Sequence, residues 1–473
     1  MTEKTQQLLN DKAWARWLAL VLIASMMFFA YMFVDVMSPL KSLLEEKLHW
    51  DSSTFGTYAA SEYFLNVFFF FLIFAGIILD KTGIRFTGLL SASLMVIGAS
   101  IKLIGISEWF ETTALCGWLD SWWSSFPGSA KMASLGFMIF GCGCEMAGTT
   151  VSKAIAKWFK GKEMALAMGV EMSIARLGVF AVMWISPLIS GMFDQSVLAP
   201  VAFCTALLVI GLLSYTVFVF MDRKFDRQLA AAGELNGEDT GGEDEEFHIS
   251  DLGKIFRSKM FWLVALLCVL YYSGIFPFQR YAPNYVQETL GVSAETASRL
   301  FSVFPILAMV LTPFLGAFLD YKGHGATMLI IGAIIMTCCH LGFAFLLPAV
   351  PQVWLAVTLI LVLGVSFSLV PAALWPSVPK IIDNNILGSA YCLIFWIQNI
   401  GLCLVPLLIG ETLDATGGYF VPMLIFATFG VLAIFFGIWL KVLNSKHNYG
   451  LEEPNVKKEN ATTLAAEAES AEE

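Results

Sequence analysis

The chain has 473 residues, of which 58% are hydrophobic and only 14% are charged. A soluble domain carries about 25% charged residues, so the composition excludes an ordinary soluble protein and indicates a polytopic membrane protein. The net charge of −10 says little about partners, because the acidic residues concentrate in residues 233–246 and near the C-terminus.

Apolar runs long enough to cross a bilayer recur along the chain, separated by short polar turns. They predict an all-α membrane protein with twelve transmembrane helices. The first apolar run is too long for a signal peptide and lacks a small-residue cleavage site. The helices are expected at residues 14–36, 54–79, 86–106, 133–156, 164–187, 201–221, 260–278, 294–319, 326–347, 354–379, 387–409 and 420–440.

The domain prediction follows from these runs. Residues 1–221 form an N-terminal six-helix bundle and residues 259–441 a C-terminal one, joined by an acidic cytoplasmic linker at 222–258. Residues 442–473 are expected to be a disordered cytoplasmic tail, because they are polar and acidic. Lys and Arg collect in the loops on one side, which places both termini in the cytoplasm.

A short motif occurs twice, six predicted helices apart. Gly76, Asp80 and Gly83 follow the second helix with the same spacing as Gly316, Asp320 and Gly323 after the eighth. Two six-helix halves in parallel repeat are typical of secondary transporters, whose substrate site lies between the halves near the midplane.

The first copy, Gly76–Arg85, resembles the loop motif of the major facilitator superfamily. That resemblance implies the twelve-helix fold of the family. It also implies that Asp80, Lys81 and Arg85 help to latch the cytoplasmic side shut. Asp320 is the counterpart in the second copy, which lacks basic residues at the positions of Lys81 and Arg85.

Five further segments narrow the resemblance to the lysosomal dipeptide uniporter branch of that superfamily. The resemblance implies that Glu145 meets the amino end of a dipeptide and that Arg176 meets its carboxylate. The lysosomal member of the branch works with a glycosylated partner, and the sequence leaves open whether this chain has an accessory subunit. The segments are residues 157–163, 172–178, 271–278, 373–376 and 397–401.

Glu145 and Arg176 also stand out without any family. Each lies about halfway along a predicted helix, where an ionisable group costs at least about 2.5–3.5 kcal/mol. A carboxylate and a guanidinium complement the two ends of a zwitterion. The alternative is a structural salt bridge between the two helices.

Neutral polar and aromatic residues are expected to complete a cavity that accepts varied side chains. The candidates lie mid-helix or within the segments that resemble the family. They are Tyr58, Tyr271, Trp375, Gln398 and Asn399.

Other acids within the apolar runs raise the question of proton coupling. Glu62 and Glu171 are candidates, because buried carboxylates can carry protons. Glu171 could instead pair with Arg176 or with Lys153. Asp35 is expected to be exposed at the outer interface, since it precedes Ser38 and Pro39.

The sequence shows no Walker loop, catalytic triad, metal cluster or nucleic-acid patch, so we expect neither an enzyme nor a bound cofactor. The favoured function is a secondary transporter that moves dipeptides or similar zwitterions by alternating access. The alternatives are a proton-coupled organic-anion transporter of the same fold and a non-transporting membrane sensor. We expect a bacterial cytoplasmic membrane rather than a lysosomal one, because the leucines within residues 3–9 miss the usual sorting signal by one residue.

Overall fold

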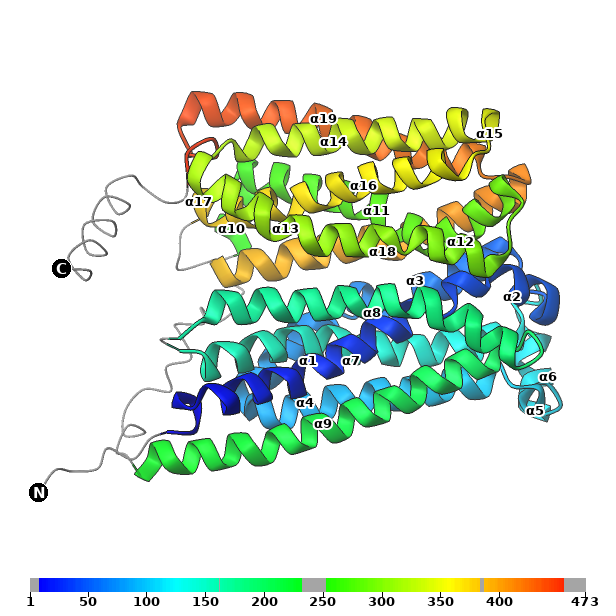
Figure 1. Cartoon of the computed structure of the whole chain (residues 1–473), viewed down its shortest axis with the longest axis horizontal. Coiled ribbons are helices and arrows are strands. Elements are labelled where there is room, and N and C mark those ends of the chain that lie inside the picture. Colours follow the sequence, from blue (N-terminus) through cyan, green and yellow to red (C-terminus); the bar gives the residue numbers. More distant parts are fainter. Residues whose placement is uncertain (1–7, 161, 232–251, 383–386, 455–473) are drawn as a thin grey trace, which may run out of the picture.

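The computed structural model describes residues 8–160, 162–231, 252–382 and 387–454, and within these ranges the regular elements are all helices. The long helices run roughly side by side and form two groups (Figure 1). We call the end where α1 begins and α19 ends the terminal end, and the opposite end, which carries α5 and α6, the far end.

The N-terminal half contains the elements up to α9. They are η1 (Leu9–Asp11), α1 (Ala13–Asp35), η2 (Ser38–Leu40), α2 (Lys41–Leu48), α3 (Ser52–Phe68), α4 (Phe71–Gly105), α5 (Glu108–Glu111), α6 (Ala114–Ser121), α7 (Gly128–Trp158), α8 (Met164–Met192) and α9 (Leu198–Ala231).

The C-terminal half contains the elements from α10 onward. They are α10 (Leu252–Arg257), α11 (Lys259–Leu290), α12 (Ala294–Phe301), α13 (Val303–Lys322), α14 (Gly325–Leu341), η4 (Gly342–Leu346), α15 (Leu347–Ala349), α16 (Val353–Leu374), η5 (Trp375–Ser377), α17 (Val378–Ile381), α18 (Leu387–Thr416) and α19 (Phe420–His447).

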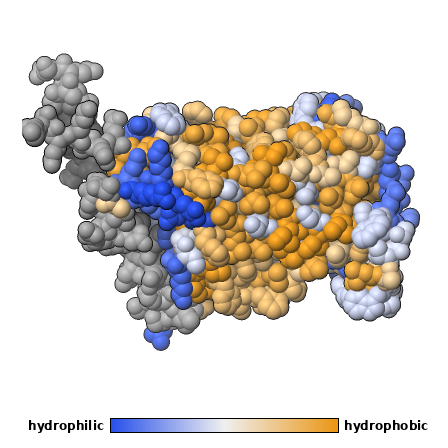
Figure 2. Space-filling view, turned by 90° about the horizontal axis from the view of Figure 1, so that it is seen from below, coloured by the Kyte–Doolittle hydropathy of each residue, from blue (hydrophilic) through white to orange (hydrophobic). Residues whose placement is uncertain are grey.

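Eleven helices of the described residues are long and apolar enough to cross a membrane, and α3 together with the part of α4 before Gly83 supplies the remaining crossing. An apolar band covers the middle of the molecule, and hydrophilic residues collect toward both ends (Figure 2). The predicted all-α, twelve-helix membrane fold is therefore confirmed.

The helix predicted at 54–79 differs from the structure, because it is broken in mid-course. Phe70 adopts a left-handed conformation with φ 52° between α3 and α4. The indole Nε1 of Trp396 on α18 donates to the Val67 carbonyl at 3.0 Å, and the Trp396 ring stacks on Phe70 at 5.4 Å. A residue of the other half thus supports the backbone where the helix is interrupted.

A second interruption lies inside α4, where Gly83 has φ 74° and ψ 171°. Glycine reaches this conformation at little steric cost because it has no Cβ. The chain reverses here: beyond Gly83, α4 runs antiparallel to α7, with Gly98 against Gly136 and Gly143 against Ser91. The motif glycine therefore makes the turn between the second and third crossings.

The segments predicted as linker and tail are partly helical. Helix α9 continues past residue 221 to Ala231, and α10 occupies part of the remaining linker. Helix α19 runs past residue 441 to His447. Residues 232–251 and 455–473 lie outside the described residues, so the division into domains stays a prediction.

Two close helix pairs position the site. Helix α3 runs parallel to α7, with Tyr58 stacked on Phe137 at 4.8 Å and the Glu62 carbonyl directly against Gly141. Helix α3 also packs against α18 of the other half, where a Cβ on Gly56 would lie 2.3 Å from the Pro406 carbonyl oxygen. Small residues permit both approaches.

Candidate substrate site and its gates

Glu145 on α7 and Arg176 on α8 both lie half-buried between the two halves. Among the described residues no ion pair joins them, so the structure does not contain the salt bridge that the sequence left open. The Glu145 carboxylate instead approaches Asn399 of α18. The Arg176 guanidinium lies 4.8 Å from the ring centroid of Phe367 on α16, and within the described chain its buried Nη1 has no hydrogen-bond partner.

Tyr31 of α1 lies near these two charged groups, and the sequence analysis did not select it. Its hydroxyl lies within electrostatic reach of Glu145, Arg176 and Glu171. The only signal in the sequence was a tyrosine hydroxyl in a largely apolar first helix, which also carries the hydroxyl of Ser25. Tyr31 therefore lies near both charged groups that the sequence singled out.

Aromatic residues of the C-terminal half face these charges. Tyr272 of α11 stacks on Phe276 at 5.3 Å and accepts a hydrogen bond from Trp375 Nε1 at 3.2 Å. It also lies within electrostatic reach of Arg176. Trp375 stacks in turn on Phe395 at 4.8 Å, and Phe395 is 38% exposed. This aromatic wall offers contact area without fixed charge.

The sequence analysis selected Tyr271, whereas in the structure its neighbour Tyr272 lies near Arg176. The Tyr271 side chain is 1% exposed and donates a hydrogen bond to the Leu329 carbonyl within the C-terminal half. Adjacent residues on a helix point about 100° apart, and apolar residues surround both positions in the sequence. The packing of α11 against α14 decides which of the two tyrosines is buried within the C-terminal half and which lies near Arg176.

Of the other neutral candidates, some are buried in packing contacts and one faces Glu145. Tyr58 is buried in the stack with Phe137, and the Gln398 side chain accepts from the Cys268 thiol at 3.4 Å. Both therefore contribute to packing. Asn399 faces Glu145, and its Nδ2 has no hydrogen-bond partner in the part of the chain that the structure describes.

A buried charge network joins the two halves on the far-end side of this site. Arg280 of α11 donates to the Glu62 carboxylate of α3 and to the Val34 carbonyl at 2.6 Å. Its Nε lies 3.4 Å from Asp35, which also accepts from Gln279 at 2.7 Å. The expectation that Asp35 is exposed was wrong, because its side chain is 1% exposed and paired with α11.

Lys102 is a second buried cation beside this network, and the sequence analysis missed it within the apolar run at 86–106. Its Nζ lies 4.2 Å, 4.7 Å and 5.0 Å from the ring centroids of Phe33, Phe137 and Tyr58. It has no hydrogen-bond partner among the described residues, so aromatic faces provide its stabilisation. It also lies within electrostatic reach of Glu62.

Further contacts close the far end. Asp414 of α18 accepts hydrogen bonds from the backbone N–H groups of Ser52 at 3.0 Å and Ser53 at 2.6 Å, at the N-terminus of α3. A carboxylate there also interacts favourably with the helix dipole. Ser42 donates to Gln287 of α11 at 3.2 Å.

The gating residues predicted from the loop motif lie at the terminal end. Asp80 accepts from Lys153 at 2.8 Å, and Arg85 lies 3.0 Å from Asp226 of α9. These ion pairs tie α4, α7 and α9 together within the N-terminal half. Lys81 is exposed, and Asp320 lies half-buried near the end of α13.

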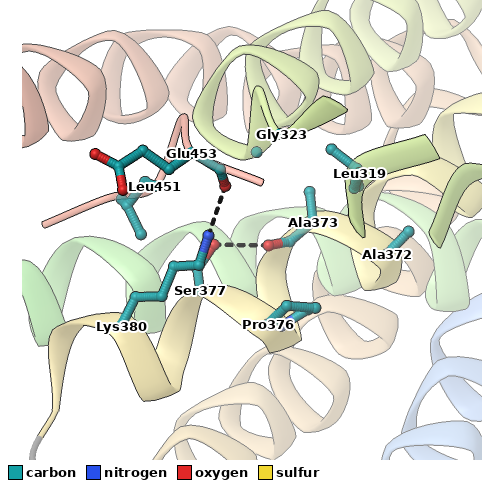
Figure 3. A pocket seen from close by; sticks show the side chains of 10 residues that line it. Leu319, Gly323, Ala372, Ala373, Pro376, Ser377, Lys380, Leu451 and Glu453 are labelled. Carbon is teal, nitrogen blue, oxygen red and sulfur yellow. Dashed lines mark hydrogen bonds between the residues drawn. The ribbon is translucent and has the colours of Figure 1, made fainter. Parts of the chain in front are cut away.

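The second motif copy contacts the C-terminal segment instead. Glu452 accepts from the Thr327 backbone N–H at 2.8 Å, and Lys380 donates to the Gly450 and Glu453 carbonyls at 3.0 Å and 2.9 Å. A pocket lies beneath this segment (Figure 3). Its lining includes Leu319, Gly323, Ala372, Ala373, Pro376, Ser377, Lys380, Leu451 and Glu453.

The two candidate proton carriers differ in their surroundings. Glu62 is committed to the ion pair with Arg280. Glu171 is half-buried on α8 and has no ion-pair partner among the described residues, so it does not pair with Arg176.

Two groups of membrane-crossing helices, with Glu145 and Arg176 half-buried between them, have the architecture of a membrane transporter. The family model of the Major Facilitator Superfamily matches residues 22–406. The chain therefore belongs to the Major Facilitator Superfamily, as the loop motif indicated.

Proteins of similar sequence and a solved structure show which members of the superfamily this chain resembles. The chain is 28% identical over 423 residues to the lysosomal dipeptide transporter MFSD1 of Danio rerio, covering 87% of this chain and 84% of that protein. It is 25% identical over 421 residues to the same transporter of Homo sapiens, covering 87% and 83%. The crystal structure of a nucleoside transporter NupG mutant superposes with a TM-score of 0.66 at 15% identity, covering 89% of this chain and 99% of that one. This last likeness shows the fold alone.

Proposed function

We propose that this transporter moves dipeptides or similar small zwitterions across the membrane by alternating access. The observation that carries the proposal is the separation of Glu145 from Arg176. Two opposite charges at mid-depth in a bilayer are costly unless something neutralises them, and here neither serves the other. A zwitterion between them satisfies both.

The chemistry of each end suits a dipeptide. The Glu145 carboxylate accepts hydrogen bonds from an ammonium group, and the planar guanidinium of Arg176 binds a carboxylate in a bidentate manner. Tyr31 lies near both charges, and the aromatic wall of Tyr272 and Trp375 tolerates varied side chains. The resemblance to lysosomal dipeptide transporters supports the same assignment.

Alternating access is supported by the distribution of contacts between the halves. The far end is joined by Arg280, Glu62 and Asp414. At the terminal end, Asp80 and Arg85 pair within one half. We infer that this conformation faces the cytoplasm and that the motif residues engage the other half when the transporter turns outward.

An alternative is a proton-coupled carrier of organic anions, held by Arg176 alone. The unpaired carboxylate of Glu171 favours it, because such a group can bind and release a proton. Uniport of a zwitterion should persist when the pH gradient is abolished, whereas coupled uptake should collapse.

We also propose that the transporter resides in a bacterial cytoplasmic membrane. The N-terminal leucines lack the spacing of a lysosomal sorting signal. The sequence leaves open whether an accessory subunit is needed, and uptake by the purified chain alone in liposomes measures this. Uptake that appears only after a second protein is added would mean that such a subunit is required.

A thermal-shift screen tests the substrate class. Ligands that bind the folded state raise the melting temperature by mass action. We expect dipeptides to raise it in the wild type, and expect Glu145→Gln and Arg176→Ala to abolish the shift. A shift with organic acids alone, lost only in Arg176→Ala, would support the alternative.

A further inference from the structure

Asn66 of α3 is buried to 1% exposure, and within the described residues neither its Oδ1 nor its Nδ2 has a hydrogen-bond partner. A buried carboxamide without partners is costly, since each unmade hydrogen bond costs about 1–3 kcal/mol. Buried polar groups are therefore nearly always satisfied. A ligand that supplies one donor and one acceptor would remove this cost.

The register between helices places Asn66 at the site. Helices α3 and α7 run in parallel, and Tyr58 meets Phe137 while Glu62 meets Gly141. Each step of four residues along α3 is matched by four along α7. The next step puts Asn66 level with Glu145.

Asn399 brings a second amide to the same level from the other half. It approaches Glu145, and its Nδ2 also lacks a partner among the described residues. Helix α18 runs antiparallel to α3, with Trp396 bonded to the Val67 carbonyl, so Asn399 lies about one helical turn from that contact. The carboxylate of Glu145 and the amides of Asn66 and Asn399 thus share one end of the site.

We propose that Asn66 is a specificity-determining residue that binds the first peptide unit of the substrate, with Asn399 of the other half as its counterpart. In an extended dipeptide the amino N–H and the carbonyl oxygen of the first residue point to the same side. The Asn66 Oδ1 accepts from the ammonium, and its Nδ2 donates to the carbonyl. Glu145 neutralises the ammonium charge.

The proposal rests on the proposed function and sharpens it. It predicts that the transporter recognises the peptide group and not only the two terminal charges. Glycylglycine and 5-aminopentanoate test this, because both have the same number of bonds between ammonium and carboxylate and only the first has a peptide group.

We would measure the affinity of both compounds for the purified full-length wild type, Asn66→Leu and Asn66→Ala. The wild type should bind glycylglycine at least about tenfold more tightly than 5-aminopentanoate, since one good hydrogen bond is worth about a factor of ten. In both variants the preference should fall below about threefold, with 5-aminopentanoate binding retained.

Melting temperatures separate this role from a structural one. Asn66→Leu should melt at or above the wild-type temperature, because it removes unsatisfied polar atoms and keeps a similar volume. Asn284→Leu is the matched control: its side chain is also buried but accepts a hydrogen bond from Tyr419, so this variant should melt lower.

The outcomes separate the two proposals. Equal binding of both compounds by the wild type, or a preference that survives Asn66→Leu, would overturn the role of Asn66 and leave the dipeptide function intact. If no dipeptide binds the wild type, the proposed function itself fails.

Discussion

The guanidinium of Arg280 on α11 donates a hydrogen bond to the carboxylate of Glu62 on α3, so a buried ion pair joins the two halves of the molecule. Asp35 of α1 lies 3.4 Å from the same guanidinium. One arginine of the C-terminal half therefore holds two acids of the N-terminal half. Under the proposed alternating access, these contacts break when the far end opens.

Replacing Arg280 with Ala should strongly destabilise the protein. The change leaves Glu62 and Asp35 buried without their arginine, and breaking a buried pair in this way costs about 3–5 kcal/mol. Thermal unfolding in detergent measures the effect. Arg299→Ala is the control, because Arg299 pairs with Glu295 at the surface and such pairs contribute at most about 1 kcal/mol. If Arg280→Ala and Arg299→Ala lowered the melting temperature equally, the buried network would not be an important source of stability.

Lys102 should matter more once Arg280 is gone. In the wild type Arg280 already pairs with Glu62 and Asp35. In Arg280→Ala the buried Lys102 still lies within electrostatic reach of both acids. A double-mutant cycle with Lys102→Met should therefore show a coupling of about 1–3 kcal/mol. Strictly additive effects on unfolding would show that Lys102 does not act on Glu62 and Asp35.

A methyl group on Gly56 should force the far end apart. Its Cβ would lie 2.3 Å from the Pro406 carbonyl oxygen, which is backbone and cannot rotate away. We expect Gly56→Ala to lower stability by about 1–3 kcal/mol, as overpacking does. Gly76→Ala is the helical control, because nothing lies within 4 Å of its Cβ position. A Gly56→Ala variant as stable as Gly76→Ala would contradict the close packing of α3 on α18.

Much of the fold was readable from the sequence, because apolar runs of sufficient length have few alternatives in a bilayer. The repeat of Asp80 and Asp320 likewise predicted two related halves. The break at Phe70 was not predictable, since no Gly or Pro marks it and the support comes from Trp396, far away in the sequence. Tertiary contact decides such details.

The candidate site was predicted in part for the same reason. Glu145 and Arg176 stand out because charge is rare in apolar helices. Asp35 was misplaced because its partners, Arg280 and Gln279, belong to the other half and approach only when the chain folds. Distinguishing Tyr272 from Tyr271 requires the orientation of α11 about its own axis, which no local sequence pattern determines.

The C-terminal segment should be released by a methyl group on Gly323. This glycine has φ 74°, and a Cβ there would lie 2.3 Å from the Glu452 carbonyl oxygen. Gly83 of the first motif copy has the same φ but open space around it, so Gly83→Ala controls for backbone strain. We expect limited proteolysis to cut near residue 450 faster in Gly323→Ala than in Gly83→Ala. Equal rates would mean that the segment is not clamped there.

Two ion pairs outside the bilayer should make stability depend on pH. The hydrogen bond from Arg16 lowers the pKa of Glu163, and that from Lys162 lowers the pKa of Asp11. A carboxylate whose pKa is lowered by folding stabilises the folded state above its ordinary pKa, and this contribution disappears as the pH falls through the lowered value.

The melting temperature of Glu163→Gln should therefore lie below that of the wild type by a constant amount from pH 7 down to about pH 5, since the ordinary pKa of Glu is about 4.3. Below that pH the gap should shrink, because the wild-type carboxylate takes up a proton and loses its charge. Asp11→Asn should follow the same course, since Lys162 donates to Asp11 at 3.0 Å. A gap that widens as the pH falls would have the wrong sign and would show that the link between Arg16 and Glu163 does not stabilise the folded state.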